Sequence, residues 1–235
     1  MPYRLNWLDR TAISIYRLLQ GGAPYLVLKR IGIATTRRRV EFYTLERLLT
    51  TMPALPGSII ECGTYRGGTL LGMAHLLARR GLTPRIYGLD SFEGFPEPTD
   101  EDRRASGEFH PEVHKGALGD TSYEDLSARI AALGWSDHVR LLKGYFEDTL
   151  PSLSEERYSL AHIDCDLYQG YMTCLEHIYP RMLPGGVIVF DDYRVSEGVY
   201  PGADRAVDEF FQGKPEKLER FDDPRGLRTF VRVVR

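Results

Sequence analysis

The pattern of apolar and polar positions along the chain predicts short buried strands that alternate with amphipathic helices. Five apolar runs of strand length end at polar residues: 58–61, 85–89, 139–143, 159–163 and 185–190. Helical spacing of apolar residues occurs between and after them, at about 70–80, 121–133, 170–179 and 202–211. Two further strand-like runs follow, at 217–220 and 228–234. This alternation is typical of an α/β domain whose mostly parallel sheet carries helices on both faces.

The segment before the first strand has a different pattern. Residues 11–20 and 40–52 place apolar side chains at helical spacing, and two glycines, Gly21 and Gly22, provide a stop after the first of them. Prolines and a glycine at 53–57 then mark the start of the main domain. We therefore expect residues 1–56 to form a small helical extension that caps the main domain, 57–235, or joins a dimer interface.

Charge separates the same two segments. Residues 1–56 hold nine Lys and Arg against three acids, so this segment is +6, while the remainder of the chain is −9. A basic arm could bind an anionic substrate, nucleic acid or the acidic face of a partner protomer. The simpler interpretation is a solvated cationic extension. The main domain shows no basic patch interleaved with aromatic residues, so we do not expect nucleic acid as a partner.

Bulk composition indicates a globular enzyme. Hydrophobic residues make up 43% of the chain and charged residues 27%, which are ordinary values. No apolar run approaches the roughly 18 residues of a membrane span, and the first residues lack the apolar core of a signal peptide. The three cysteines are an odd count without metal-ligand spacing, which favours a reducing compartment. The expected location is the cytoplasm.

A glycine-rich turn, residues 62–69, follows the first strand and precedes a helix. Strand, glycine turn and helix form the opening unit of a nucleotide-binding α/β fold, in which backbone N–H groups approach a ligand closely. The spacing is Gly63-x3-Gly67-Gly68, which does not meet the Gly-x-Gly-x-x-Gly fingerprint of dinucleotide sites. This departure argues against the main alternative function, an NAD-type oxidoreductase on a similar architecture.

Residues just after the second and third strands could complete a nucleotide-like site. Asp90 ends the second strand, where an acid can accept hydrogen bonds from a ribose diol, although it could instead cap a helix. Tyr145 and Phe146 follow the third strand. They could form one wall of a pocket for a planar base or serve in ordinary core packing.

Two strand ends carry paired aspartates. Asp164 and Asp166 follow the fourth strand, and Asp191 and Asp192 follow the fifth. Ligands of open α/β sheets bind beyond the carboxyl ends of the strands, so these acids are expected to meet in one crevice. Like charges about 4 Å apart repel by about 4 kcal/mol at an effective dielectric near 20. The cluster therefore predicts a hard divalent cation held by oxygen ligands.

Residues 93–119 show no clear periodicity and are rich in prolines, acids and glycines. A loop of this length in a compact domain is usually functional or disordered, and we expect a lid over the substrate. His110 and His114 within it could do acid–base work or could be ordinary surface histidines. The loop ends at a capping box, Thr121 to Glu124, that starts the next helix.

Taken together, these motifs resemble the macrocin O-methyltransferase (TylF-type) family of class I S-adenosylmethionine-dependent methyltransferases. The resemblance covers about residues 58–211. The stretches that carry it are ECGTYRGG (61–68), LDSFEGFP (89–96), GYFEDTLP (144–151), DCDLY (164–168), YP (179–180) and PGGVIVFDDY (184–193). It implies a class I methyltransferase, Rossmann-like fold. It also implies an enzyme that uses S-adenosylmethionine and Mg²⁺ to methylate a hydroxyl, of a sugar or vicinal diol, in a natural product or other small molecule.

The same resemblance assigns roles to the residues. It places the methionine part of the cofactor over the glycine turn, the ribose at the second strand end and the adenine after the third. The implied cofactor-binding residues are Glu61, Gly63, Thr64, Gly67, Gly68, Thr69, Asp90, Ser91, Tyr145 and Phe146. The implied metal ligands are Asp166, Asp191 and Asp192, with Asp164 as a further ligand or as the catalytic base. Family patterns often have glycine where this chain has Cys165. We expect a small-molecule acceptor and a homo-oligomer.

Overall fold

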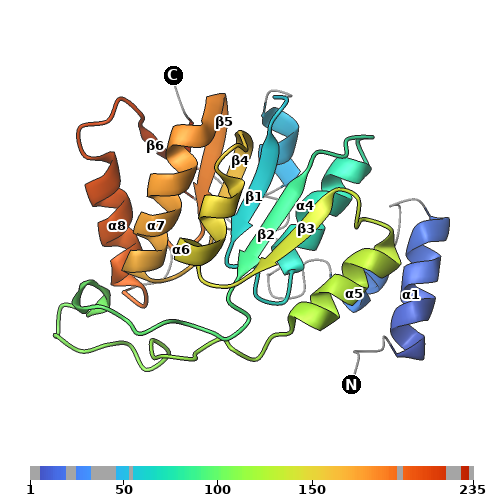
Figure 1. The fold of residues 1–235 in the computed structure, drawn as a ribbon, viewed down its shortest axis with the longest axis horizontal. Coiled ribbons are helices and arrows are strands. Elements are labelled where there is room, and N and C mark those ends of the chain that lie inside the picture. Colours follow the sequence, from blue (N-terminus) through green and yellow to red (C-terminus); the bar gives the residue numbers. More distant parts are fainter. Residues whose placement is uncertain are drawn as a thin grey trace.

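A seven-stranded sheet forms the centre of the molecule in the computed structural model (Figure 1). The structure describes residues 6–19, 25–32, 46–52, 55–194, 198–220 and 229–232. The strands are β1 (Ser58–Cys62), β2 (Ile86–Asp90), β3 (Val139–Lys143), β4 (Tyr158–Ile163), β5 (Met182–Phe190), β6 (Leu218–Arg220) and β7 (Thr229–Arg232). Their order is β3-β2-β1-β4-β5-β7-β6, with β1 to β5 parallel and β7 antiparallel to both its neighbours. The predicted mostly parallel sheet is confirmed.

Helices cover both faces of this sheet, as expected (Figure 1). The α-helices are α1 (Trp7–Leu18), α2 (Tyr25–Arg30), α4 (Gly68–Ala78), α5 (Tyr123–Leu133), α6 (Phe146–Thr149), α7 (Tyr168–Ile178) and α8 (Pro201–Phe211). Short 3₁₀ turns occur at η1 (Asp100–Asp102), η2 (Leu150–Leu153) and η3 (Tyr179–Arg181). One apolar core packs α1, α4 and α5 against one face, and a second packs α7 and α8 against the other. Alternate strand residues supply the two cores because successive side chains of a strand point to opposite faces.

The order of the strands creates a switch point beside β1. The chain moves outward from β1 through β2 to β3, then crosses back so that β4 pairs with the other side of β1. Register aligns the last residues of three neighbouring strands, Cys62 with Ile163 and Ile163 with Phe190. The residues that follow these strands therefore emerge side by side at one edge, where open α/β sheets bind their ligands.

The N-terminal helices differ from the predicted ranges. Helix α1 starts at Trp7, four residues before the predicted start, because the Asn6 side chain caps it by accepting from the Asp9 N–H at 3.0 Å. Helix α2 was not predicted. The second predicted helix, 40–52, is helical at 46–51, and its earlier part and Gly21 and Gly22 lie outside the described residues. Among the described residues, no helix is both long and apolar enough to cross a membrane.

Candidate active site

A cavity of about 340 Å³ lies at the carboxyl edge of the parallel strands, a size that suits a small-molecule site. Its walls come from the glycine turn, the ends of β2 to β5 and the segment after β2. The lining residues are Glu61, Gly63, Thr64, Tyr65, Thr69, Asp90, Ser91, Gly94, Phe95, Pro96, Leu118, Gly144, Tyr145, Phe146, Asp164, Cys165, Asp166, Asp191 and Asp192. Every predicted site residue except Gly67 and Gly68 is among them.

Two glycines of the turn, Gly63 and Gly67, are required for different structural reasons. Gly63 has φ +87°, and a Cβ atom built on it would lie 1.7 Å from the carbonyl oxygen of Asp164. Only glycine therefore lets the turn after β1 approach the turn after β4. Gly67 has φ +79°, and a Cβ there would lie 2.3 Å from Leu126 Cδ1 of α5. Gly67 thus serves close helix packing, and neither it nor Gly68 lines the cavity.

Asp90 lies in the cavity wall and is held there by two backbone hydrogen bonds. Its Oδ2 accepts from the Tyr65 N–H and its Oδ1 from the Phe92 N–H, each at 2.7 Å. Burial raises the pKa of Asp90, against a smaller opposing effect of these backbone hydrogen bonds. Asp90 does not cap a helix, since the residues directly after it are irregular. Ser91 is also engaged locally, as its hydroxyl donates to the Gly94 carbonyl at 2.8 Å.

The two aromatic residues after β3 lie at the cavity, and one of them also belongs to the core. Tyr145 and Phe146 both line the cavity. Phe146 also packs against the apolar core between the sheet and α7, where its ring lies close to Gly170. Phe146 thus belongs both to the cavity wall and to the core.

The paired aspartates converge, as the sequence predicts. Asp166, Asp191 and Asp192 are at most 9% exposed. Asp166 adopts φ +62°, a left-handed conformation that aspartate tolerates better than most residues. Its N–H donates to Asp192 Oδ2 at 3.0 Å, and the same oxygen accepts from the Tyr171 hydroxyl at 3.0 Å. Asp192 is therefore fixed by groups in the turn after β4 and on α7.

Burial and mutual repulsion perturb this cluster. Burial, followed by the charges of Asp164 and Asp191, raises the pKa of Asp166 well above its usual value. Burial, followed by the charges of Asp166 and Asp191, does the same to the pKa of Asp192. A bound cation would offset both causes, because an opposite charge favours the ionised carboxylate.

His162 is a site residue that the sequence reasoning missed. Its Nε2 lies 3.3 Å from Asp191 Oδ1, and its Nδ1 lies 3.2 Å from Glu61 Oε1. Donor atoms of His162, Asp164 and Asp191 all lie within 4.8 Å of one another. The available signal was strand alternation. His162 precedes Asp164 by two residues, a spacing that places both side chains on the same face of a strand. Glu61 on β1 is the register partner of His162 and shares this face.

Tyr200, directly before α8, is a second missed residue. Its side chain packs against the apolar cluster of Phe95, Val113 and Leu167. A side-chain hydrogen bond from Tyr200 lowers the pKa of Asp166, against the larger effect of burial. No sequence motif marks it.

The side chains of the acidic end suit a metal ion. Carboxylate oxygens with one nearby imidazole suit a divalent cation, and the mainly oxygen donor set favours a hard one. The residues present therefore fit the predicted metal.

The segment 93–119 borders the cavity with its two ends and is anchored at several points. Backbone hydrogen bonds join Phe95 to Ala117 at 2.9 Å and to Gly116 at 3.0 Å. Asp102 in η1, which the sequence did not predict, accepts from the Tyr168 N–H at 2.7 Å and so caps α7 from a distant part of the chain. Gly94, Phe95, Pro96 and Leu118 contribute to the cavity wall.

The two histidines of this segment lie away from the cavity lining. His110 accepts from the Glu112 N–H at 3.2 Å, and the exposed His114 contacts the Lys115 carbonyl. Neither residue is among those that line the cavity. This placement favours ordinary surface histidines over acid–base residues.

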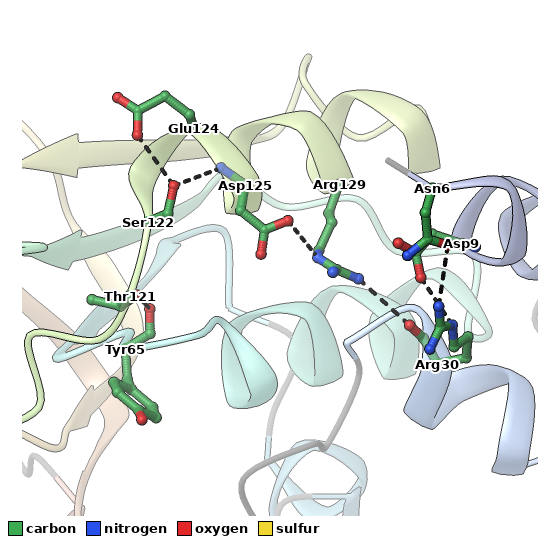
Figure 2. A network of polar contacts seen from close by, with 9 residues as sticks. All are labelled: Asn6, Asp9, Arg30, Tyr65, Thr121, Ser122, Glu124, Asp125 and Arg129. Carbon is green, nitrogen blue, oxygen red and sulfur yellow. Dashed lines mark hydrogen bonds and ion pairs between the residues drawn. The ribbon is translucent and has the colours of Figure 1, made fainter. Parts of the chain in front are cut away.

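A chain of polar contacts connects the glycine turn to the N-terminal helices (Figure 2). The Thr121 hydroxyl donates to the Tyr65 carbonyl at 2.6 Å, just before α5. Along α5, Asp125 pairs with Arg129 at 3.0 Å, and Arg129 reaches the Arg30 carbonyl at 3.5 Å. Arg30 in turn pairs with Asp9 and hydrogen-bonds to Asn6. The N-terminal segment thus braces α5, against which the glycine turn packs.

The cap of α5 corrects the predicted capping box by one residue. Ser122, not Thr121, is the N-cap, and its hydroxyl accepts from the Asp125 N–H at 3.1 Å. Thr121 is instead used to hold the glycine turn. Glu124 lies in the first turn and accepts from the Ser122 hydroxyl at 3.2 Å.

Known proteins share both the sequence pattern and the fold. A tetracenomycin-C derivative 4'-O-methyltransferase of Streptomyces olivaceus (acting on an 8-demethyl-8-(2,3-dimethoxy-alpha-L-rhamnosyl) compound) is 35% identical over 155 residues, 65% of this chain and 58% of that protein. Mycinamicin III 3''-O-methyltransferase of Micromonospora griseorubida is 33% identical over 159 residues, 66% of this chain and 61% of that protein. The matched region thus spans about three fifths of these relatives.

Solved structures agree on the fold. The calicheamicin methyltransferase CalS11 superposes with a TM-score of 0.70 at 21% identity, covering 98% of this chain and 94% of that one. The O-methyltransferase NovP superposes with a TM-score of 0.66 at 21% identity, covering 97% and 98%. The model of the macrocin O-methyltransferase (TylF) family matches residues 34–222, most of the length of the chain. The protein therefore belongs to the macrocin O-methyltransferase (TylF) family.

Proposed function

We propose that this protein transfers a methyl group from S-adenosylmethionine to a hydroxyl of a small-molecule acceptor, with Mg²⁺ bound beside the acceptor. The observation that carries the proposal is one cavity shared by the glycine turn and the four aspartates. A methyl donor bound at the turn would point its sulfonium toward the acids. Holding donor and acceptor in line is itself a large catalytic effect, since effective molarities reach about 10⁵ M or more.

The donor end of the cavity offers one group for each part of S-adenosylmethionine. Glu61, which is buried, would accept from the amino group of the methionine part. The side chain of Asp90 would accept from the ribose hydroxyls, and Tyr145 and Phe146 would flank the adenine. Backbone N–H groups of the turn at Gly63 and Thr64 complete this end.

The acidic end would hold the cation and move the proton. Asp166, Asp191 and Asp192 are the proposed main ligands, and the bound cation would lower the pKa of the acceptor hydroxyl and fix its direction. Asp164 is the proposed base because it lines the cavity and is the least buried of the four. It takes the hydroxyl proton as the acceptor oxygen bonds to the methyl carbon. The carbon–sulfur electron pair then stays on sulfur.

The proposed acceptor is a sugar hydroxyl of a glycosylated natural product. One relative is a 4'-O-methyltransferase of a rhamnosyl tetracenomycin compound, and another is a 3''-O-methyltransferase of mycinamicin III. A sugar diol can reach a cation with one face and lie against Phe95 and Leu118 of the segment 93–119 with the other. This surface combines charged and apolar walls, as amphipathic sugar rings require.

The test is methyl transfer from radiolabelled S-adenosylmethionine to a panel of glycosides, nucleosides and catechols, with Mg²⁺ or with chelator. We expect turnover on glycosides that needs Mg²⁺. Asp191→Ala should reduce turnover by about 100-fold or more, because a metal Lewis acid contributes several kcal/mol. Asp148→Ala, at an exposed acid on α6, is the matched control and should retain activity.

Two results would reject the proposal. Full activity of Asp191→Ala, or of the wild type in excess chelator, would remove the metal from the mechanism. Binding of NADH without binding of S-adenosylmethionine in parallel titrations would favour the oxidoreductase alternative.

A further inference from the structure

Three side chains form a row across neighbouring strands beneath the cavity. Glu61 on β1 is the register partner of His162 on β4, and His162 is the partner of Val189 on β5. Asp191 follows Val189 by two residues and therefore points to the same face of the sheet. The row runs from the donor end of the cavity to the acidic end, with His162 in the middle.

The histidine lies behind the cavity and contacts both of its neighbours. His162 is 4% exposed, and it is absent from the cavity wall that both Glu61 and Asp191 help to form. Its Nε2 hydrogen-bonds to Asp191 Oδ1 at 3.3 Å, and its Nδ1 lies 3.2 Å from Glu61 Oε1, a charge contact that does not meet hydrogen-bond geometry. One rigid five-membered ring thus fixes the separation of two carboxylates that serve different ligands.

The chemistry of the imidazole suits this position. The two buried carboxylates, one on β1 and one just after β5 with β4 between them, repel each other. A neutral imidazole can donate to one of them and an imidazolium to both. Groups that hydrogen-bond to the ligands of a metal orient those ligands, and their loss typically reduces metal affinity by about 10- to 100-fold. A carboxylate that receives the amino group of a methyl donor needs the same orientation.

We propose that His162 is a positioning residue that orients Glu61 for the methyl donor through Nδ1 and Asp191 for the cation through Nε2. The inference rests on the proposed function, since it assumes a donor at Glu61 and a cation at Asp191. It assigns His162 no contact with either ligand. Each ring nitrogen serves one ligand, so the two effects can be separated by substitution.

Two amide side chains reproduce one half of the ring each. In His162→Asn the amide nitrogen takes the place of Nδ1 and keeps the contact with Glu61. In His162→Gln it takes the place of Nε2 and keeps the contact with Asp191. The probes are S-adenosylhomocysteine, measured by calorimetry in chelator, and Mn²⁺, measured by electron paramagnetic resonance without the nucleoside. Neither measurement requires turnover.

We expect a split between the two variants. His162→Asn should weaken Mn²⁺ binding by about 10-fold or more and keep the affinity for S-adenosylhomocysteine, and His162→Gln should do the reverse. The matched control is His75→Gln, because His75 is equally buried but hydrogen-bonds to Tyr16 on α1, away from the cavity. It should lower thermal stability and leave both affinities unchanged.

Several results would overturn the inference. Equal losses of both affinities in both variants would mean that His162 has only a structural role, and no change in either would mean that it positions nothing. Loss of Mn²⁺ binding in both variants, with S-adenosylhomocysteine binding intact, would make His162 a metal ligand. If the wild type bound neither probe, the proposed function would fail first.

A measurement on the unaltered protein covers the case in which the variants do not fold. In wild type labelled with ¹⁵N-histidine, S-adenosylhomocysteine should shift mainly the Nδ1 resonance of His162, and Mg²⁺ mainly its Nε2 resonance. A ring whose two nitrogens respond to neither ligand would contradict the inference.

Discussion

The approach of two turns at Gly63 gives a prediction whose size follows from the structure. An alanine at this position would have to adopt φ +87° and would place its Cβ 1.7 Å from the Asp164 carbonyl oxygen. The left-handed conformation costs about 1–2 kcal/mol, and forcing extra volume into a packed region typically costs a further 1–3 kcal/mol. We expect Gly63→Ala to lower the free energy of unfolding by about 2–5 kcal/mol.

A second glycine separates these two costs. Gly81 has φ +70°, and a Cβ there would meet nothing within 4 Å. Gly81→Ala should therefore show only the conformational cost of about 1–2 kcal/mol. Urea unfolding of both variants measures the difference, which reports the collision between the turns after β1 and β4.

Binding gives the second readout of the same pair of variants. Gly63→Ala pushes apart the turns that carry Glu61 and Asp164, so we expect it to weaken the binding of S-adenosylhomocysteine, whereas Gly81→Ala should bind as the wild type does. Equal destabilisation by the two substitutions, with unchanged binding, would refute the argument that close approach of the turns shapes the site.

The remaining predictions concern His75 at the contact of α4 with α1, the segment 93–119 and the acidic cluster. Burial lowers the pKa of His75 from 6.5 to about 4, so the unfolded chain binds this proton more readily than the folded protein does. The contribution of the neutral His75 to stability is therefore complete above about pH 6.5 and is lost as the pH falls toward 4. Urea unfolding should show that this part of the pH dependence is absent from His75→Gln. Asp102→Ala removes the cap of α7 at Tyr168, worth about 0.5–2 kcal/mol, and should speed trypsin cleavage within 93–119, while unchanged cleavage would show that the cap does not hold this segment. Tyr200→Phe removes the hydrogen bond to Asp166 and should weaken Mn²⁺ binding by about 10-fold; an unchanged dissociation constant would mean that the phenol has no part in orienting this carboxylate.

The strands and the four aspartates could be predicted from the sequence because both depend on local pattern. A buried parallel strand is a short apolar run, and the register of parallel strands brings their ends together whatever the loops do. The predicted range 139–143 matches the observed β3, and the predicted range 217–220 nearly matches the observed β6. The predicted site residues other than Gly67 and Gly68 line the cavity for the same reason.

What could not be predicted depends on contacts between distant parts of the chain. His162 lies inside an apolar strand, and its role becomes visible only when β1 and β5 are placed on either side of it. Tyr200, just before α8, contacts Asp166, 34 positions earlier in the chain, and no local pattern specifies this contact. Ser122 rather than Thr121 accepts from the first turn of α5, while the Thr121 hydroxyl donates to the distant Tyr65 carbonyl, a contact that the local sequence does not reveal.

The distant cap of α7 has a consequence for the order in which the protein folds. Leu167, at the N-cap position, makes no side-chain cap hydrogen bond. The cap comes from Asp102, which lies 66 positions before the Tyr168 N–H that it accepts from. Contacts between distant residues close a large loop and form slowly. The first turn of α7 also carries Tyr171, whose hydroxyl holds Asp192. The acidic site is therefore expected to be among the last regions to acquire its native geometry, after the sheet beneath it has formed.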